Sequence, residues 1–226
     1  MLEKKSFKEN VKTEIEKLKK MSFKDKMWYI KEYYSIQIFL TLLVAAILGS
    51  IIFNMFFKKD AVFNAIFLNK PVTSEAYDKI YNEFNTYAGF EKTGDHWELS
   101  TNVSVILKDG VIVNGMEYLA KTNAMIAAQL LDVLVTEEYF INHFCNQDIL
   151  ADLEQTLPPD LLEKLKENLV YKTGIDGVER AYALDVSNAP VIKESVYVAG
   201  PIYFSILANS KNIDASILFL KYLYNM

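Results

Sequence analysis

The sequence has few of the residues on which covalent cross-links and thiol chemistry depend. Cysteine occurs once, at Cys145, so no intramolecular disulfide can form. A single cysteine is typical of a small buried apolar group, and a reactive thiol is the alternative interpretation. Arginine also occurs once, at Arg180, among 24 basic residues. This bias towards lysine indicates no particular mechanism.

Histidine is scarce, and the common catalytic motifs are missing. The two histidines, His96 and His143, lie far apart, and the chain has no G-x-S-x-G, P-loop or H-E-x-x-H sequence. The spacing of His143, Cys145 and Asp148 matches no common metal motif. No catalytic set can be assembled, so the sequence predicts a protein that is not an enzyme and has neither a metal nor a cofactor.

Charged residues are missing from one long and mostly apolar stretch, residues 36–57, which runs for 22 residues. As a helix it would extend roughly 33 Å, enough to cross a hydrocarbon core of about 30 Å. The alternatives are a buried helix of a soluble core and a cleavable signal peptide. A signal peptide fits poorly, because the charged leader is 35 residues long and no A-x-A-like site follows. The stretch therefore predicts a transmembrane helix in contact with the lipid bilayer.

The charge on the two sides of this stretch differs in sign. Residues 1–35 contain ten lysines and six acidic residues, a net charge of +4; since the whole chain carries −5, the remainder carries −9. Lysine and arginine concentrate on the cytoplasmic side of a span. We therefore expect a single-pass protein of the cell membrane with a cytoplasmic amino terminus and an extracellular carboxyl-terminal domain. An acidic domain also argues against nucleic acid as a partner.

Three regions follow from these patterns. Residues 1–35 form a basic leader and a juxtamembrane helix, residues 36–57 the span, and residues 58–226 one extracellular domain without repeats. Residues 7–20 have the spacing of a basic amphipathic helix, with a disordered leader as the alternative. Ser22 and Asp25 predict the start of the next helix, and aromatic residues at 28–34 are typical of a membrane interface.

The extracellular domain alternates between strand-like and helix-like segments. We expect a strand near 62–68 and a helix from Thr73 or Ser74 to about Tyr87. A strand from 97 to 107, a helix from 116 to 130, a helix beginning at Pro158–Asp160, a hairpin within 170–186, a strand within 196–208 and a closing helix at 214–224 complete the pattern. The order is that of an α/β domain with a mixed sheet.

The segment LLDVLVTEEYF, residues 130–140, is the most informative part of this domain. A short apolar strand without a polar face, 131–135, follows one helix, and another helix is expected to open at Thr136. Strands that are apolar on both faces belong to sheets covered by helices on both sides. We therefore expect this strand in the centre of the sheet.

This segment, the following ILADLEQTLP, the hairpin ending in YALDV and the closing block FSILANSKNIDASILFLKYL resemble the extracellular solute-binding proteins of ATP-binding-cassette importers. The closing block is similar to the family pattern NSKN-x-x-A-x-x-FL-x-x-L at Asn209, Ser210, Lys211, Asn212, Ala215, Phe219, Leu220 and Leu223. The resemblance covers residues 116–226. It implies a truncated, membrane-anchored form with one lobe, because about 165 residues are too few for two lobes.

Six residues are candidates for ligand binding. Thr136 and Glu137 follow the apolar strand at its carboxyl end, where open α/β sheets bind ligands. Asp132 begins the same strand, where a carboxylate that bonds backbone is the alternative interpretation. The remaining candidates are Tyr182, Asp185 and Asn209.

The sequence favours a membrane-anchored extracellular domain that recognises a small solute or a partner protein. The alternative is an accessory subunit without a small-molecule site that docks on a membrane transporter or another membrane protein. A deep cleft lined by Thr136, Glu137 and Tyr182 would favour the first function, and an exposed apolar patch the second.

Overall fold

The computed structural model describes residues 7–57, 61–108, 111–197 and 199–226. The chain divides into two compact units, Met1–Lys58 and Lys59–Met226. The division lies one residue from the boundary predicted after Phe57. Lys58, Lys59 and Asp60, on which part of the charge argument rests, lie outside the described residues.

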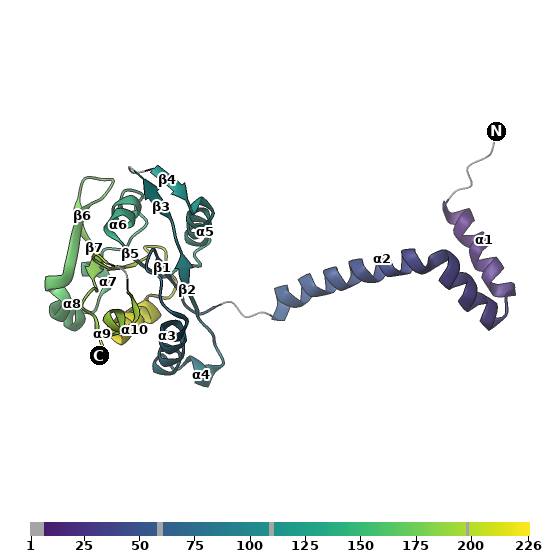
Figure 1. The fold of residues 1–226 in the computed structure, drawn as a ribbon, viewed down its shortest axis with the longest axis horizontal. Helices are drawn as coiled ribbons and strands as arrows, with labels where there is room; N and C mark the ends of the chain where they lie inside the picture. Colours follow the sequence, from purple (N-terminus) through teal and green to yellow (C-terminus); the bar gives the residue numbers. More distant parts are fainter. Residues whose placement is uncertain (1–6, 58–60, 109–110, 198) are drawn as a thin grey trace. The chain divides into compact units, whose positions relative to one another are not determined.

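The first unit contains two helices, α1 (Phe7–Lys20) and α2 (Phe23–Phe57) (Figure 1). The predicted amphipathic segment is therefore helical. Ser22 caps α2, since its hydroxyl oxygen accepts from the Asp25 amide at 3.3 Å and its hydroxyl donates to the Asp25 carboxylate at 2.6 Å. This is the start signal that the sequence predicted.

Helix α2 is long and apolar enough over Phe23–Phe53 to cross a membrane, and its most apolar window has no buried residue. Large apolar side chains are exposed along its length; Ile36, Leu42 and Phe53, for example, are 71%, 63% and 62% exposed. The length and the apolar composition of this helix suit a hydrocarbon core. It is a candidate membrane span.

The second unit is built on a six-stranded mixed sheet in the order β2-β1-β5-β8-β7-β6. Strands β2, β1 and β5 are parallel, while β8 is antiparallel to both β5 and β7, and β6 is antiparallel to β7. The strands are β1 (Asn64–Leu68), β2 (Glu98–Val103), β5 (Val133–Thr136), β6 (Leu169–Thr173), β7 (Glu179–Asp185) and β8 (Tyr203–Ile206). A separate hairpin pairs β3 (Ile106–Lys108) with β4 (Val111–Asn114).

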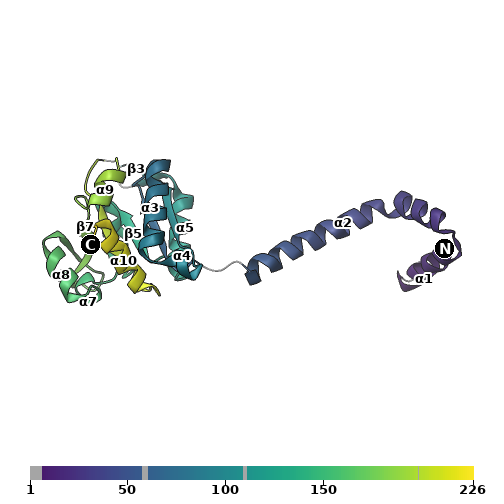
Figure 2. The ribbon, with the colours of Figure 1, turned by 90° about the horizontal axis from the view of Figure 1, so that it is seen from below.

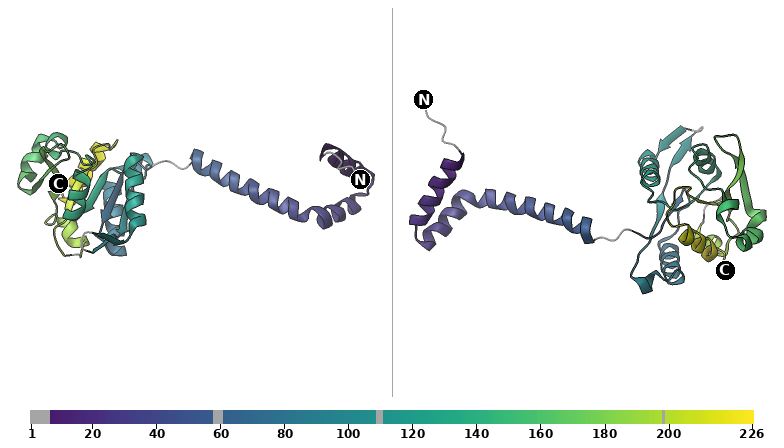
Figure 3. Two further views of the ribbon diagram at one scale, coloured as in Figure 1. Left: turned by 90° about the horizontal axis from the view of Figure 1, so that it is seen from above. Right: turned by 180° about the vertical axis from the view of Figure 1, so that it is seen from behind.

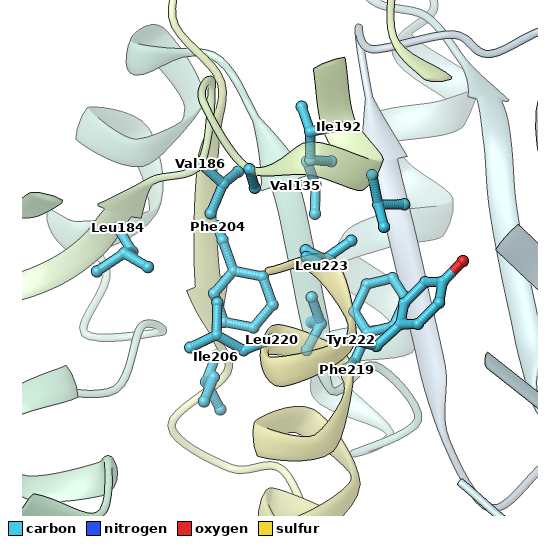
Figure 4. Close-up of a cluster of buried hydrophobic side chains, with 14 of the residues drawn as sticks. Val135, Leu184, Val186, Ile192, Phe204, Ile206, Phe219, Leu220, Tyr222 and Leu223 are labelled. Atoms are coloured by element: carbon cyan, nitrogen blue, oxygen red, sulfur yellow. The ribbon is translucent and has the colours of Figure 1, made fainter. Parts of the chain in front are cut away.

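Successive residues of the central strands pack on opposite faces of this sheet. In β5, Val133 and Val135 join one apolar cluster and Leu134 joins the other. Figure 4 shows Val135 in the first cluster with Phe204 of β8 and with side chains of α10. All four residues of β5 are buried, which confirms the prediction of a central strand covered on both faces.

Helices lie on both sides of the sheet (Figures 2 and 3). The first cluster includes residues of α3 (Ser74–Tyr87), α7 (Leu153–Thr156), α8 (Pro159–Leu165), α9 (Pro190–Ser195) and α10 (Ile213–Leu223). The second includes residues of α5 (Met116–Ala127) and α6 (Glu138–Cys145). The short helix α4 (Phe90–Thr93) follows α3, and a 3-10 turn, η1 (Lys166–Asn168), follows α8.

The structure differs from the sequence predictions at several boundaries. Thr136 remains in β5, because it pairs with Tyr203 of β8, and α6 begins only at Glu138. The Thr136 hydroxyl also donates to the carbonyl oxygen of Leu68 at 3.0 Å. The strand expected over 97–107 is divided between β2 and β3, and the strand expected within 196–208 is limited to β8. The helix expected to reach residue 130 ends at Ala127. Residues 109–110 of the expected turn lie outside the described residues.

Candidate binding groove

A groove of about 570 Å³ runs along β2, at the edge of the sheet. Its volume lies within the range of small-ligand sites, about 300–1,000 Å³. The first turns of α3 form one wall and the exposed side of α5 forms the other. The groove is lined by Ile66, Val72, Thr73, Ser74, Tyr77, Asp78, Leu99, Ser100, Thr101, Asn102, Val103, Tyr118, Lys121 and Thr122.

The residues just before α3 and α5 determine where the two walls of the groove begin. Thr73 caps α3, and its hydroxyl oxygen accepts from the Ala76 amide at 3.2 Å. Helix α5 starts after Gly115, which has a φ of +83°. A β-carbon at Gly115 would lie 2.1 Å from the carbonyl oxygen of Ser104, so only glycine allows the start of α5 to approach the segment that follows β2 so closely.

Aromatic rings extend from the groove along α3. The rings of Tyr77 and Tyr81 stack with centroids 6.0 Å apart, and those of Tyr81 and Trp97 stack at 5.2 Å. Tyr77 is half-buried, and its burial, together with nearby Tyr81 and Asp78, raises the pKa of its hydroxyl. Tyr77 is therefore a neutral hydrogen-bonding group in the groove at neutral pH.

Two of the predicted site residues, Thr136 and Glu137, lie at the carboxyl end of β5 and are engaged within the domain. Thr136 is fully buried. Asn69 donates from its amide nitrogen to Glu137 Oε1 and to the carbonyl oxygen of Val105, each at 2.9 Å. Asn69 Oδ1 accepts from the Val105 amide at 2.7 Å, although its backbone has a φ of +58°. Glu137 thus helps to hold the connection between β2 and β3.

The opposite end of β5 holds Asp132. This carboxylate is 1% exposed and accepts from the Asn64 amide at 2.9 Å and from the Ser210 hydroxyl at 2.6 Å. The Asn212 amide nitrogen also donates to it, at 3.2 and 3.3 Å. Asp132 therefore joins β1 to the turn before α10, which is the backbone-bonding alternative stated above.

Asn209 lies in that same turn. Its amide nitrogen donates to the carbonyl oxygen of Ile126 at 2.7 Å, which ties the turn to the end of α5. Its Oδ1 atom is buried without a hydrogen bond in the described part of the chain. The segment Asn209–Asn212, which carries much of the family resemblance, thus has a structural explanation within this domain.

Tyr182 and Asp185 lie on β7. Tyr182 is 1% exposed, and its hydroxyl oxygen accepts from Arg180 at 3.0 Å. Arg180 also forms an ion pair with Asp176 at 2.6 Å, which secures the tip of the hairpin. Asp185 accepts from the amide and from the hydroxyl of Ser187. Both residues therefore have intramolecular partners.

The six candidates do not form one site. Asp132 and Asn209 lie at one end of the sheet, whereas Thr136, Glu137 and Asp185 lie at the other, because Thr136 and Asp185 both pair with Tyr203. None of the six lines the groove along β2. The sequence signal for the groove was the polar run Ser100–Asn102 within a predicted strand.

Sequence reasoning also missed Lys70, which follows β1 at the carboxyl end of the parallel strands. The residue is only 1% exposed, and the described residues provide its ammonium group with neither a hydrogen bond nor an ion pair. Burial lowers the pKa of Lys70, and the nearby Glu137 carboxylate opposes part of that change. A buried cation without a close partner is costly.

The residues that the structure describes contain no assembled site for metal or thiol chemistry. No group of three His, Cys, Asp or Glu side chains there could hold a metal ion. Cys145 is buried and free, and burial raises the pKa of its thiol, which confirms the interpretation as an apolar core group. Comparisons with protein-family models, with curated proteins and with solved structures give no match to this chain.

Proposed function

We propose that this protein is a single-pass membrane protein whose carboxyl-terminal α/β domain binds a ligand outside the cell without transforming it. The observation that carries the proposal is the groove along β2. It combines a volume of about 570 Å³ with apolar and polar lining residues from four elements, β1, β2, α3 and α5. Sites that recognise ligands have this combination of apolar area and a few polar groups.

The anchor and the orientation rest on α2 and on charge. A long helix with exposed apolar side chains is unfavourable in water and suited to lipid. The leader carries +4 and the rest of the chain −9. Because basic residues remain on the cytoplasmic side, the domain lies outside.

The resemblance to one lobe of a solute-binding protein is part of this proposal. The mixed sheet, the central β5 and the single domain are compatible with it. We assign the ligand site, however, to the groove on the edge of the sheet. The six residues that the sequence indicated have intramolecular roles.

The test uses the full chain in lipid nanodiscs. Thermal unfolding is measured with a panel of free amino acids, monosaccharides, nucleotides and short peptides. We expect at least one class to raise the Tm, since a ligand that binds only the folded state stabilises it. Lys121→Trp, which places a large ring on the wall of the groove, should abolish the shift. Lys164→Trp, at an exposed position of α8, is the matched control. A shift unchanged by Lys121→Trp would contradict the proposal.

A second candidate function is that of an accessory subunit of a membrane complex, and the hairpin β3-β4 favours it. Ile106, Val111, Val113 and Met116 are each more than 50% exposed on this hairpin and just after it. Such clustered apolar side chains are typical of protein contacts. If this surface docks on a partner, Val111→Ser with Val113→Ser should release the protein from any larger assembly seen after mild detergent extraction. An unchanged assembly size would contradict it.

A further inference from the structure

We propose that the ligand of the groove is an extended peptide that adds to the sheet as an extra strand along β2. This inference rests on the proposed function and names its ligand class. Peptides that add a strand to a sheet bind mainly through their main chain, and side-chain pockets then provide specificity. The argument concerns the outer edge of β2, the two walls and the length of the groove.

The main chain of β2 is free on its outer side. The Glu98 amide donates to the carbonyl oxygen of Phe63 at 2.9 Å, so Glu98 faces the neighbouring strand β1. Hydrogen bonding alternates along a parallel pair, so Ser100 also faces β1. Leu99 therefore turns its amide and carbonyl groups, and Thr101 its amide, away from β1 and towards the groove that they line; beyond Thr101 the register shifts, and the Val103 carbonyl again faces β1, where it accepts from the Asn69 amide at 2.8 Å.

Leu99 and Thr101 would contact a ligand through their main-chain groups. The Leu99 and Thr101 side chains are buried, with residue exposures of 6% and 5%. Within residues 61–108, 111–197 and 199–226, no backbone group bonds to the outer edge of Leu99 or Thr101. The amides of Leu99 and Thr101 and the carbonyl of Leu99 are thus available to an added strand.

The walls suit the alternating side chains of a strand. Side chains of an extended peptide point alternately to the two faces of the sheet. Peptide side chains on one face of the sheet would contact Thr73, Ser74 and Tyr77 at the start of α3. Those on the other face would contact Tyr118 and Lys121 of α5. Successive peptide side chains would contact opposite walls.

Length and shape favour a peptide over other occupants. The groove follows residues 99–103, which at about 3.3 Å per residue corresponds to about 17 Å of extended chain. A compact solute would leave much of this edge without hydrogen bonds. A second copy of the domain fits less well, because its own α3 and α5 would flank its β2 in the same way and meet the helices of the first copy.

The first experiment measures binding of a defined peptide to the full chain in nanodiscs. The probe is a fluorescent heptapeptide of alternating threonine and valine, capped at both ends, and the readout is fluorescence polarisation. Two control peptides carry N-methyl groups, one on every second residue and one on every residue. A strand pairs through one edge only, so the first control should bind and the second should not. Equal binding of the fully methylated peptide would overturn the inference.

The second experiment changes the edge itself. Thr101→Pro removes an amide that faces the groove and leaves the bonds between β2 and β1 in place, because proline is compatible with the outer side of an edge strand. We expect this variant to weaken peptide binding by about tenfold or more. Thr101→Val keeps the amide and the side-chain shape, so its affinity should equal that of the parent. Tm measurements without peptide show whether each variant is folded.

The outcomes separate this inference from the proposed function. One outcome is that no peptide binds up to about 1 mM, while a small solute binds to the parent protein and not to the Lys121→Trp variant. The groove is then a ligand site and the peptide inference is wrong. If neither binds, both are wrong. Peptide binding that Thr101→Pro leaves unchanged in a folded protein would place the peptide elsewhere and overturn the inference. Self-association lost in Thr101→Pro would identify a second copy as the occupant instead.

Discussion

Lys70 is the residue whose environment conflicts most with its chemistry. It lies two residues after the end of β1 and is 1% exposed, and the Glu137 carboxylate offsets part of the effect of burial on its pKa. Burial lowers its pKa from the value of 10.5 in the unfolded chain. The folded state therefore binds this proton more weakly than the unfolded state does, and the charged side chain costs stability at neutral pH.

Replacing Lys70 with methionine should stabilise the domain. We expect a gain of about 1 kcal/mol at pH 7, or about 2–4 °C in Tm. The gain should persist at all pH values below the lowered pKa and diminish as the pH rises towards 10.5, since the unfolded lysine then also loses its proton. Lys92→Met, at an exposed lysine of α4, should have no comparable effect. Thermal unfolding between pH 6 and 10 checks both statements, and a gain that grew with pH would contradict the assignment.

Asp132 is a second residue with a testable role. Its carboxylate receives hydrogen bonds from Asn64, Ser210 and Asn212, so Asp132→Ala would leave buried donors unpaired. We expect a loss of about 3 kcal/mol in the free energy of unfolding. Glu163→Ala, at an exposed acid of α8, should change it by less than about 0.5 kcal/mol. Urea unfolding provides the measurement, and near-equal values for the two variants would refute the structural role.

At the scale of elements, β5 has the clearest prediction. Val133 is fully buried between β1 and β8, so Val133→Asp would place a charge in the core without a partner. The cost is several kcal/mol against a total stability of about 5–15 kcal/mol. The domain should fail to fold and should become sensitive to limited proteolysis. Val113→Asp, 58% exposed on β4, should remain resistant. A folded Val133→Asp protein would contradict the central position of β5.

The elements that the sequence predicted well have local signals. Thr73 at the start of α3, the apolar run of β5 and the turn at Gly177 each act within a few residues. The boundaries that differed depend on distant partners. Thr136 stays in β5 because it pairs with Tyr203 of the distant strand β8, and the division between β2 and β3 depends on Asn69, which bonds to Val105. Neither contact has a local signal.

The candidate site was harder to predict for the same reason. Asp132 and Asn209 are polar residues beside apolar runs, a pattern shared by ligands and by structural groups, and only their partners distinguish the two. The groove depends on the position of β2 at the edge of the sheet and on two helices that are distant in sequence. Its most useful groups are the main-chain groups of Leu99 and Thr101, which no residue type reveals.

At the scale of the whole molecule, the orientation can be tested directly. The +4 leader and the −9 remainder predict that protease added to intact cells digests residues beyond about Lys59 and spares the leader. Antibodies to tags at the two termini report each fragment. Permeabilised cells serve as the control, since there both ends should be digested. Protection of the carboxyl-terminal tag in intact cells would reverse the topology.

The position of β8 has a consequence for the order in which the domain assembles during synthesis. This strand lies near the carboxyl terminus in sequence, yet it is inserted between β5 and β7. Until residue 206 has left the ribosome, the three parallel strands and the β6-β7 hairpin have no strand to join them. Translation is slow relative to the pairing of strands, so the strands made earlier remain in two separate groups until β8 has been synthesised. The domain therefore completes its sheet only after its last strand has been made, and a chain that ends before β8 leaves two unjoined half-sheets.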